Sequence, residues 1–478
     1  MTGQHPRSLS LGEERPVALD HGVALLREAW RSFDEARPHQ PPVSLATLGL
    51  TESALPDDGI GVRAALDAAA RVLDESLAQT RPRFFGYVGS SGLESAVLAD
   101  ALAMSHDVNL AAESAAALLV EQQTLHWVGQ LVGFPAAAGT VTSGGMLSNL
   151  TALMAARTRT FPDSRRTGMV GVRAAVYASA EAHSSVERAV EVLGLGRDSL
   201  RPVPLDDRRR MDPRALAAAV AADVAAGVTP MAVVATAGTT LTGAVDPVGA
   251  VADVVQGSGA WLHVDGAYGL PAACTEVAGH LFAGLDRADS VSVDAHKWLF
   301  VPKACGILLV SDPTTLRAAF RHDASYMLEE EGYIHPVDET MEYSRAFRSL
   351  KLWTALRAHG AQAFRDAITT TIELARELAQ AVRERPGLEL LVPEPELSTV
   401  PFRRLPSRGD PDEHNRRLAR ALQEDGRVYV TSAVVDGRTC LRPCIVNFRT
   451  TRADVLAIVD LADELGRRLE HEHDGPAA

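Results

Sequence analysis

The chain contains very little lysine. Of its 478 residues, 47 are Lys or Arg, and only three of these are lysine: Lys297, Lys303 and Lys351. An arginine side chain stays protonated and cannot act as a nucleophile, whereas a lysine amine can lose its proton and form a Schiff base. A lysine that persists in so arginine-rich a chain therefore indicates chemistry that arginine cannot supply.

Other absences narrow the class of protein. The formal net charge is −14, so the chain lacks the basic surface that nucleic acids and anionic membranes attract. No apolar run is long enough to span a bilayer, and the first residues show no secretory signal. The four cysteines lack partners at zinc spacing. We expect no metal, no nucleic-acid or membrane partner, reduced thiols and a cytoplasmic location.

The middle of the chain predicts an α/β fold. From residue 139, short apolar runs alternate with helical patterns, which is typical of a sheet covered by helices on both faces. The expected strands are 174–178, 231–236, 261–265, 290–293 and 306–311, and the expected helices are 148–157, 184–193, 213–226 and 246–256.

A smaller α+β unit is expected after residue 347. A long helical pattern runs to about residue 385. Short strands are expected near 387–392, 398–403, 427–432 and 439–448, with helices at 411–424 and 452–470.

Lys297 stands at the end of a predicted strand, directly after His296. A His-Lys pair at such a position suggests a lysine that holds pyridoxal 5′-phosphate (PLP). The alternative is a surface lysine beside the core residue Trp298. The string alone does not decide between the two.

Two further segments follow predicted strands, where ligands collect in open α/β sheets. Gly144, Gly145 and Met146 open a helix, and small residues at a helix N-terminus suit a phosphate. Asp265 ends an apolar strand, where a carboxylate is costly unless it is paired, for example with a protonated pyridine nitrogen. Ala267 leaves room for a flat ring. The alternatives are an ordinary Ser/Gly helix cap and a helix-capping aspartate.

Two more polar residues also follow predicted strands. His183 starts a helix and could stack on a planar ring, or it could be a simple cap. Thr236 begins a turn whose hydroxyl groups could contact a ring oxygen, or it could belong to a polar turn without a ligand.

The order and spacing of these segments resemble the PLP-dependent group II decarboxylases, which include the aromatic amino acid, histidine and glutamate decarboxylases. The resemblance runs from about residue 82 to 469. It is carried by segments 142–150, 182–189, 235–246, 263–269, 294–298, 347–353 and 441–449. The chain is most similar to the aromatic-amino-acid branch, because 84–87 and 347–353 look like segments of that branch.

The resemblance implies the PLP-dependent transferase fold type I. A helical N-terminal segment would span 1–85, and a large domain with a mostly parallel seven-stranded sheet would span 86–350. A small α+β domain would span 351–478. The resemblance also implies a homodimer with active sites at the interface.

The same resemblance assigns roles to the residues already described. Lys297 would hold PLP, Asp265 would pair with the pyridine nitrogen, and His183 and Ala267 would lie on opposite faces of the ring. Thr236 would lie near the ring substituents. The residues near the phosphate would be Gly144, Gly145, Met146 and His296.

The implied activity is decarboxylation of an L-amino acid, aromatic in the branch that the chain resembles most, to the amine. A tyrosine donates a proton to the substrate carbon in this family, and here Tyr333 is the first candidate and Tyr326 the second. Alternatives are decarboxylation coupled to oxidative deamination, which gives an aldehyde, or another PLP-dependent lyase reaction.

The sequence departs from the family at three places. Met146 stands where many members carry Ser or Thr, so only its backbone N–H remains for the phosphate. Segment 109–114 lacks an aromatic residue that lines the pocket in the animal enzymes, and Gly89 replaces a proline.

Two other classes of protein were weighed. A PLP-shaped protein that binds without catalysing is disfavoured, because Lys297 and Asp265 are both retained. A nucleotide-binding α/β enzyme would need a Gly-x-Gly-x-x-Gly turn after its first strand, and none is present.

Overall fold

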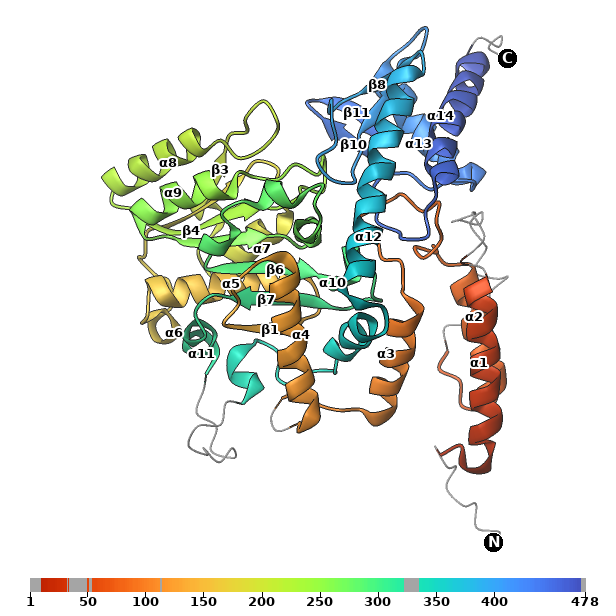
Figure 1. Ribbon diagram of the computed structural model, residues 1–478, viewed down its shortest axis with the longest axis horizontal. Helices are drawn as coiled ribbons and strands as arrows, with labels where there is room; N and C mark the ends of the chain where they lie inside the picture. Colours follow the sequence, from red (N-terminus) through yellow and green to blue (C-terminus); the bar gives the residue numbers. More distant parts are fainter. Residues whose placement is uncertain are drawn as a thin grey trace.

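A seven-stranded sheet and a four-stranded sheet organise the chain (Figure 1). The computed structural model describes residues 10–31, 33, 50, 54–111, 114–321 and 335–473. The strands of the large sheet are β1 (Ala138–Thr142), β2 (Ala174–Ser179), β3 (Leu200–Val203), β4 (Thr229–Thr236), β5 (Trp261–Asp265), β6 (Ser290–Asp294) and β7 (Gly306–Val310).

The large sheet is mostly parallel. Its strand order is β1-β7-β6-β5-β4-β2-β3. All pairs from β6 to β3 are parallel, whereas β7 runs antiparallel to both of its neighbours. The predicted fold type I architecture, with its mostly parallel seven-stranded sheet, is confirmed.

The pairing of the strands aligns their polar ends. Thr236 lies opposite Asp265 in the β4–β5 pair, and Asp265 lies opposite Ser292 in the β5–β6 pair. Asp294 pairs with Gly306 at the start of β7. The polar residues that end β4, β5 and β6 therefore lie together at the carboxyl ends of these strands.

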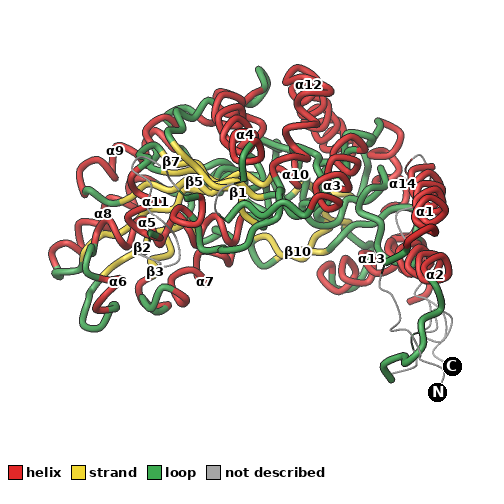
Figure 2. The backbone as a smooth tube through the Cα atoms, turned by 90° about the horizontal axis from the view of Figure 1, so that it is seen from below, coloured by secondary structure: helices red, strands yellow, loops and turns green. Residues whose placement is uncertain are grey.

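Helices cover both faces of this sheet, as Figure 2 shows. One core contains side chains of α4 (Ala116–Val132), α8 (Pro213–Ala225) and α9 (Val248–Ser258), and the other contains those of α5 (Gly145–Thr160), α7 (Ser184–Val192) and α11 (Thr314–Phe320). Successive strand residues alternate between the two cores, so Val233 and Ala235 face one and Ala232 and Val234 face the other. Two helices of a single turn, α6 (Ser164–Thr167) and α10 (Ala295–Trp298), follow α5 and β6.

The C-terminal part has a core of its own. Its elements are α12 (Ser349–Glu384), β8 (Leu388–Leu390), β9 (Phe402–Arg404), α13 (Pro411–Asp425), β10 (Ser432–Val435), β11 (Arg438–Leu441) and α14 (Arg452–His473). The long helix α12 joins the two parts, because Leu352 and Ile368 pack in the core of the large sheet and Leu378 and Val382 pack in the C-terminal core.

The strand predicted at 427–432 is wrong in position. Within that range Tyr429 forms only an isolated bridge to Phe84, and the strand β10 begins at Ser432. A tight hairpin joins β10 to β11 through Asp436 and Gly437, whose φ angles are 50° and 74°. An Asp-Gly pair favours such a turn, and this turn fixes where the two strands lie.

In the described part of the chain, α4 is preceded by α1 (Arg15–Arg31), α2 (Val62–Asp74) and α3 (Glu94–His106). In Figure 1, α1 and α2 lie side by side at the edge of the molecule. Neither α1 nor α2 contains a buried residue.

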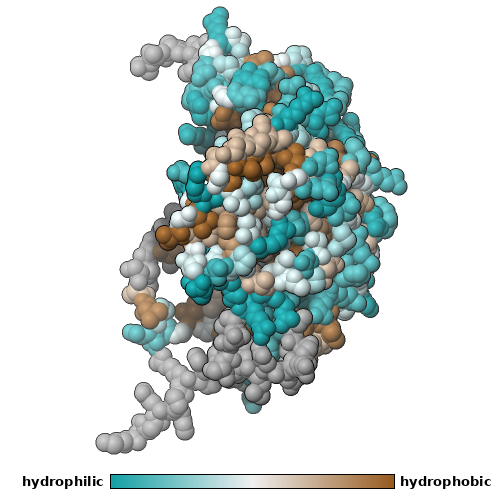
Figure 3. Space-filling model, turned by 90° about the vertical axis from the view of Figure 1, so that its left-hand side faces the viewer, coloured by the Kyte–Doolittle hydropathy of each residue, from teal (hydrophilic) through white to brown (hydrophobic). Residues whose placement is uncertain are grey.

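The surface and the thiols agree with the composition. The face on the left of Figure 1 is mainly hydrophilic, with apolar side chains in small patches (Figure 3). All four cysteines are free. Across the described ranges, every helix is too short or too polar to cross a membrane.

Candidate active site

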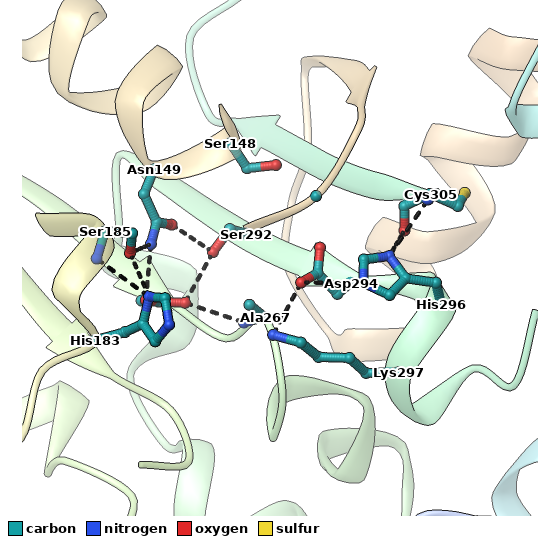
Figure 4. Close-up of polar contacts among 12 residues, drawn as sticks. Ser148, Asn149, His183, Ser185, Ala267, Ser292, Asp294, His296, Lys297 and Cys305 are labelled. Atoms are coloured by element: carbon teal, nitrogen blue, oxygen red, sulfur yellow. Dashed lines mark hydrogen bonds and ion pairs between the residues drawn. The ribbon is translucent and has the colours of Figure 1, made fainter. Parts of the chain in front are cut away.

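The predicted site residues meet in one pocket at the carboxyl ends of β4, β5 and β6. Its lining comprises Gly145, Met146, Asn149, His183, Ser185, Thr236, Gly238, Thr240, Asp265, Ala267, Tyr268 and Lys297. Gly144 and His296 directly precede the lining residues Gly145 and Lys297, and a Cβ added to Gly144 would lie 3.4 Å from His296 Cε1. Tyr333 and Tyr326 lie outside the described residues. Figure 4 shows His183 on one side of Ala267 and Lys297 on the other.

The start of α5 forms a cradle for an anion. A Cβ added to Gly145 would lie 2.8 Å from Ala267 Cβ, so this position excludes a side chain. Met146 is 41% exposed and is the second residue of α5, so its N–H is one of the first-turn N–H groups that have no partner within the helix. Unpaired N–H groups and the positive end of the helix dipole favour a negative charge here.

Asp265 is held by neutral hydrogen-bond donors. Its Oδ2 accepts from Asn149 Nδ2 at 2.7 Å, and its Oδ1 accepts from the Ala267 N–H at 3.2 Å and Ser292 Oγ at 3.3 Å. The residue is only 6% exposed. A buried carboxylate surrounded by neutral donors is matched by a cationic ligand atom, such as a protonated ring nitrogen.

Asn149 uses its whole amide in this arrangement. Its Nδ2 also donates to Ser185 Oγ at 2.9 Å, and its Oδ1 contacts His263 Nε2 at 3.0 Å and accepts from Ser292 Oγ at 2.9 Å. His263 is fully buried, and burial lowers its pKa to about 4. The imidazole is therefore neutral at pH 7, and it fixes the amide that in turn orients Asp265.

Replacing Asn149 by alanine should lower the free energy of unfolding by about 1–3 kcal/mol, because several buried polar groups lose a partner. Loss of the donor to Asp265 should also shift the visible absorption of bound PLP. Urea denaturation and absorption spectra measure the two effects. Thr151→Ala is the matched control, since Thr151 is buried in the same helix but bonds only to Leu147 O. A spectrum as unchanged as that of the control would contradict this role of Asn149.

His183 is a helix cap that also lines the pocket. It is the N-cap of α7, and its Nδ1 accepts from the Ser185 N–H at 3.1 Å. This contact leaves the remaining ring hydrogen on Nε2 and fixes the orientation of the imidazole. The same ring lines the pocket.

Thr236 supplies a hydroxyl group that lacks a partner. Its Oγ1 is buried and makes no hydrogen bond to the described residues. Its N–H donates to Asp246 Oδ2 at 2.7 Å, and burial raises the pKa of Asp246 to about 6. Buried hydroxyl groups are normally hydrogen-bonded, so this one is available to a ligand in the pocket.

Lys297 differs from the other two lysines. Its side chain is 24% exposed, and its Nζ lies 2.9 Å from Asp294 Oδ2. The next residue, Trp298, is fully buried and stacks on Tyr268 at 5.1 Å. Lys303 donates to Gln79, and Lys351 forms an ion pair with Asp100, both away from the pocket.

Several residues of the site carry no assigned role in the sequence analysis: Asn149, Ser185, Tyr268, His263, Ser292 and Asp294. A signal for some of them exists. Along β5 and β6 the polar residues His263, Asp265, Ser292 and Asp294 occupy alternate positions, and alternate residues of a strand share a face. Polar residues repeating with this period in buried strands predict a polar face next to α5.

These features suit one class of cofactor. A side-chain-free cradle, a buried carboxylate, an unpartnered hydroxyl group and a lysine amine line one pocket. They match the phosphate, the ring nitrogen, the ring substituents and the aldehyde of PLP. Fold and site together define a PLP-dependent enzyme of fold type I.

Comparison with known proteins names the family. The family model described as "Pyridoxal-dependent decarboxylase conserved domain" matches residues 45–405. The chain belongs to this family, it is a PLP-dependent carboxy-lyase, and its cofactor is PLP.

Similar proteins of known activity match most of the chain. An aromatic-L-amino-acid decarboxylase of Bacillus atrophaeus is 33% identical over 422 residues, which are 86% of each chain. An L-2,4-diaminobutyrate decarboxylase of Rhizobium meliloti is 34% identical over 439 residues, covering 88% of this chain and 86% of the relative. The crystal structure of Oryza sativa TDC with PLP and tryptamine has a TM-score of 0.90 at 27% identity, covering 98% and 100% of the two chains.

Proposed function

We propose that the protein converts an L-amino acid to the corresponding amine, with Lys297 and Asp265 as its central site residues. The observation that carries this proposal is that both side chains line one pocket at neighbouring strand ends. Bound PLP supplies an electron sink for the bond that breaks when carbon dioxide leaves. Asp265 holds a proton on the ring nitrogen, His183 stacks on the ring, and Thr236 contacts a ring substituent. The α5 cradle with His296 binds the phosphate.

An aromatic substrate is supported by a cluster of three aromatic rings, two of which belong to segment 84–90. The rings of Phe84 and Tyr429 stack at 5.0 Å, and Tyr87 lies 6.4 Å from Tyr429 and is 49% exposed. The same segment contacts the chain that follows Lys297, because Ser90 Oγ donates to Val301 O at 3.0 Å. We propose that these rings form the wall that receives the substrate side chain.

A panel of substrates tests the proposed reaction. Purified protein is given aromatic amino acids, 2,4-diaminobutyrate and cysteine sulfinate, and carbon dioxide, ammonia and peroxide are followed together. Amine without ammonia supports the proposal, and preference for an aromatic substrate supports the proposed wall. Aldehyde with ammonia and peroxide would instead establish oxidative deamination, and the absence of carbon dioxide would overturn both.

Tyr333 is the proposed proton donor to the substrate carbon, on sequence grounds alone. Replacing it by phenylalanine should make aldehyde the main product, because protonation of the substrate carbon slows and dissolved dioxygen can then accept two electrons, with release of ammonia and hydrogen peroxide. Product analysis of the variant measures the ratio of amine to aldehyde. Tyr326→Phe is the control. Normal amine formation by Tyr333→Phe would remove Tyr333 from this role.

We also propose a homodimer. The helices α1 and α2 and the residues just before α2 present apolar side chains to solvent, with Val17, Leu19, Ile60 and Leu73 between 63% and 70% exposed. A large apolar surface of this kind is typical of a covered interface. Sedimentation equilibrium should give twice the chain mass of 50.9 kDa, and the single mass would contradict the proposal.

A further inference from the structure

Asp294 is a buried carboxylate without a role in the reaction described above. It ends β6 and is the N-cap residue of α10, and it is 2% exposed. Aspartate is a favoured N-cap because its side chain accepts from the first N–H groups of the helix. Here the side chain makes no such bond. Its carboxylate therefore does not cap the backbone of its own helix.

The carboxylate points to the anion cradle of α5. A Cβ added to Gly145 would lie 3.0 Å from Asp294 Oδ2, and one added to Gly144 would lie 3.8 Å from Asp294 Oδ1. Oδ1 is buried and has no hydrogen-bond partner among the described residues. A negative group thus faces the helix N-terminus that would bind the cofactor's phosphate.

Lys297 is the cationic side chain in direct contact with Asp294. Lys297 Nζ is 2.9 Å from Oδ2, and His296 Nε2 is 3.8 Å from the same oxygen (Figure 4). Burial lowers the pKa of His296, whose Nδ1 lies 3.1 Å from Cys305 O. From the neighbouring strand, Asp265 adds a second negative charge to the pocket.

The remaining titratable neighbours act at longer range. Burial and the charge of Lys297 lower the pKa of Lys303, whose Nζ donates to Gln79 Oε1 at 2.8 Å. Burial raises the pKa of the Cys305 thiol to about 12, so it stays neutral. A phosphate held in the cradle would therefore share with Asp294 the positive charge of Lys297.

We propose that Asp294 competes with the cofactor's phosphate for the N-terminus of α5, and that binding of the phosphate is coupled to uptake of one proton by Asp294. Two anions that share a site cannot both keep their full charge, so one of them holds a proton. A protonated carboxyl group donates a hydrogen bond to the phosphate where the carboxylate would repel it. The proposal rests on the proposed placement of the phosphate at Gly144, Gly145 and Met146.

The cofactor affinity of the holoenzyme tests this coupling. Equilibrium dialysis between pH 6 and pH 9 gives the dissociation constant of PLP for the wild type and for Asp294→Asn. The ratio of the wild-type constant to the variant constant should rise with pH, by up to about tenfold per pH unit where one proton is taken up. Titration of the cofactor's phosphate itself is common to both proteins and cancels in this ratio. A ratio independent of pH would overturn the proposal.

Sulfate is a second probe because it remains a dianion over this pH range. Its competition with PLP should weaken with rising pH in the wild type and should lose this dependence in Asp294→Asn. Asp265→Asn is the matched control, since it removes a carboxylate of the same pocket that contacts the other end of the cofactor, and it should keep the wild-type dependence. Loss of the dependence in Asp265→Asn would also overturn the assignment to Asp294.

Two further measurements distinguish a failure of the proposal from a variant that does not fold and from a cofactor that binds elsewhere. If Asp294→Asn does not fold, Asp294→Ser provides a neutral side chain that is also a favoured N-cap, and the same ratio is expected. Borohydride reduction followed by peptide mapping locates the cofactor. A label outside Lys297 would overturn the proposed placement itself, whereas a label on Lys297 with parallel pH profiles would overturn only the role of Asp294.

Discussion

Replacing Asp265 by asparagine is expected to leave PLP bound but to lower turnover by about 10²–10³-fold, the size of effect seen when a preorganised electrostatic contact is lost. The amide cannot keep the ring nitrogen protonated, so the ring accepts electrons less well. Binding should persist because the cradle and Lys297 are unchanged. Steady-state kinetics and the PLP content of the purified variant measure the two quantities.

A carboxylate outside the pocket serves as the control for this variant. Asp223 lies in α8, and its side chain is 14% exposed. Its carboxylate accepts hydrogen bonds from Tyr177 in β2 and Arg201 in β3, and none of these residues lines the pocket. Asp223→Asn should keep its turnover even if it loses stability. Near-normal turnover of Asp265→Asn would mean that Asp265 supports the fold and not the reaction.

Borohydride reduction is expected to fix PLP on Lys297, and Lys297→Arg should lose both this label and about 10³-fold or more in turnover. Arginine keeps a positive charge near Asp294 but offers no nucleophilic amine. Peptide mapping is unambiguous here because the chain has only three lysines.

Lys303→Arg is the matched control for this substitution. Lys303 donates to Gln79 Oε1 at 2.8 Å, a contact that a guanidinium group can also make, so label and turnover should both remain. A label found on Lys303 or Lys351 would refute the assignment of Lys297.

The central strands could be predicted from the sequence, but the edge strands could not. Strands β2, β4, β5, β6 and β7 all coincide with predicted ranges to within two residues, because these buried strands are short segments rich in apolar and β-branched residues. The two strands absent from the prediction, β1 and β3, form the two edges of the sheet. The first contains Gly139 and the second Pro202, and both residue types are poor strand formers that edges tolerate.

For the site, too, residues marked by their neighbours in the sequence could be predicted, whereas contacts made only in the folded chain could not. Lys297 and Asp265 stand at strand ends, and strand ends are visible in the sequence. The partners of Asp265 are different, because Asn149 lies 116 residues away along the chain and reaches the carboxylate only in the folded sheet. Hydrogen-bond partners that are brought together by strand order cannot be recognised from spacing.

The pairing register of β5 and β6 links correct folding to activity. The polar side chains of both strands face α5, while Val264 and Val293 face the opposite core. A slip of either strand by one residue would exchange the two faces and would push Asp265 or Asp294 into an apolar core without donors. Mispaired chains should therefore be too unstable to accumulate, so a folded molecule of this protein is also one whose reactive groups are correctly aimed.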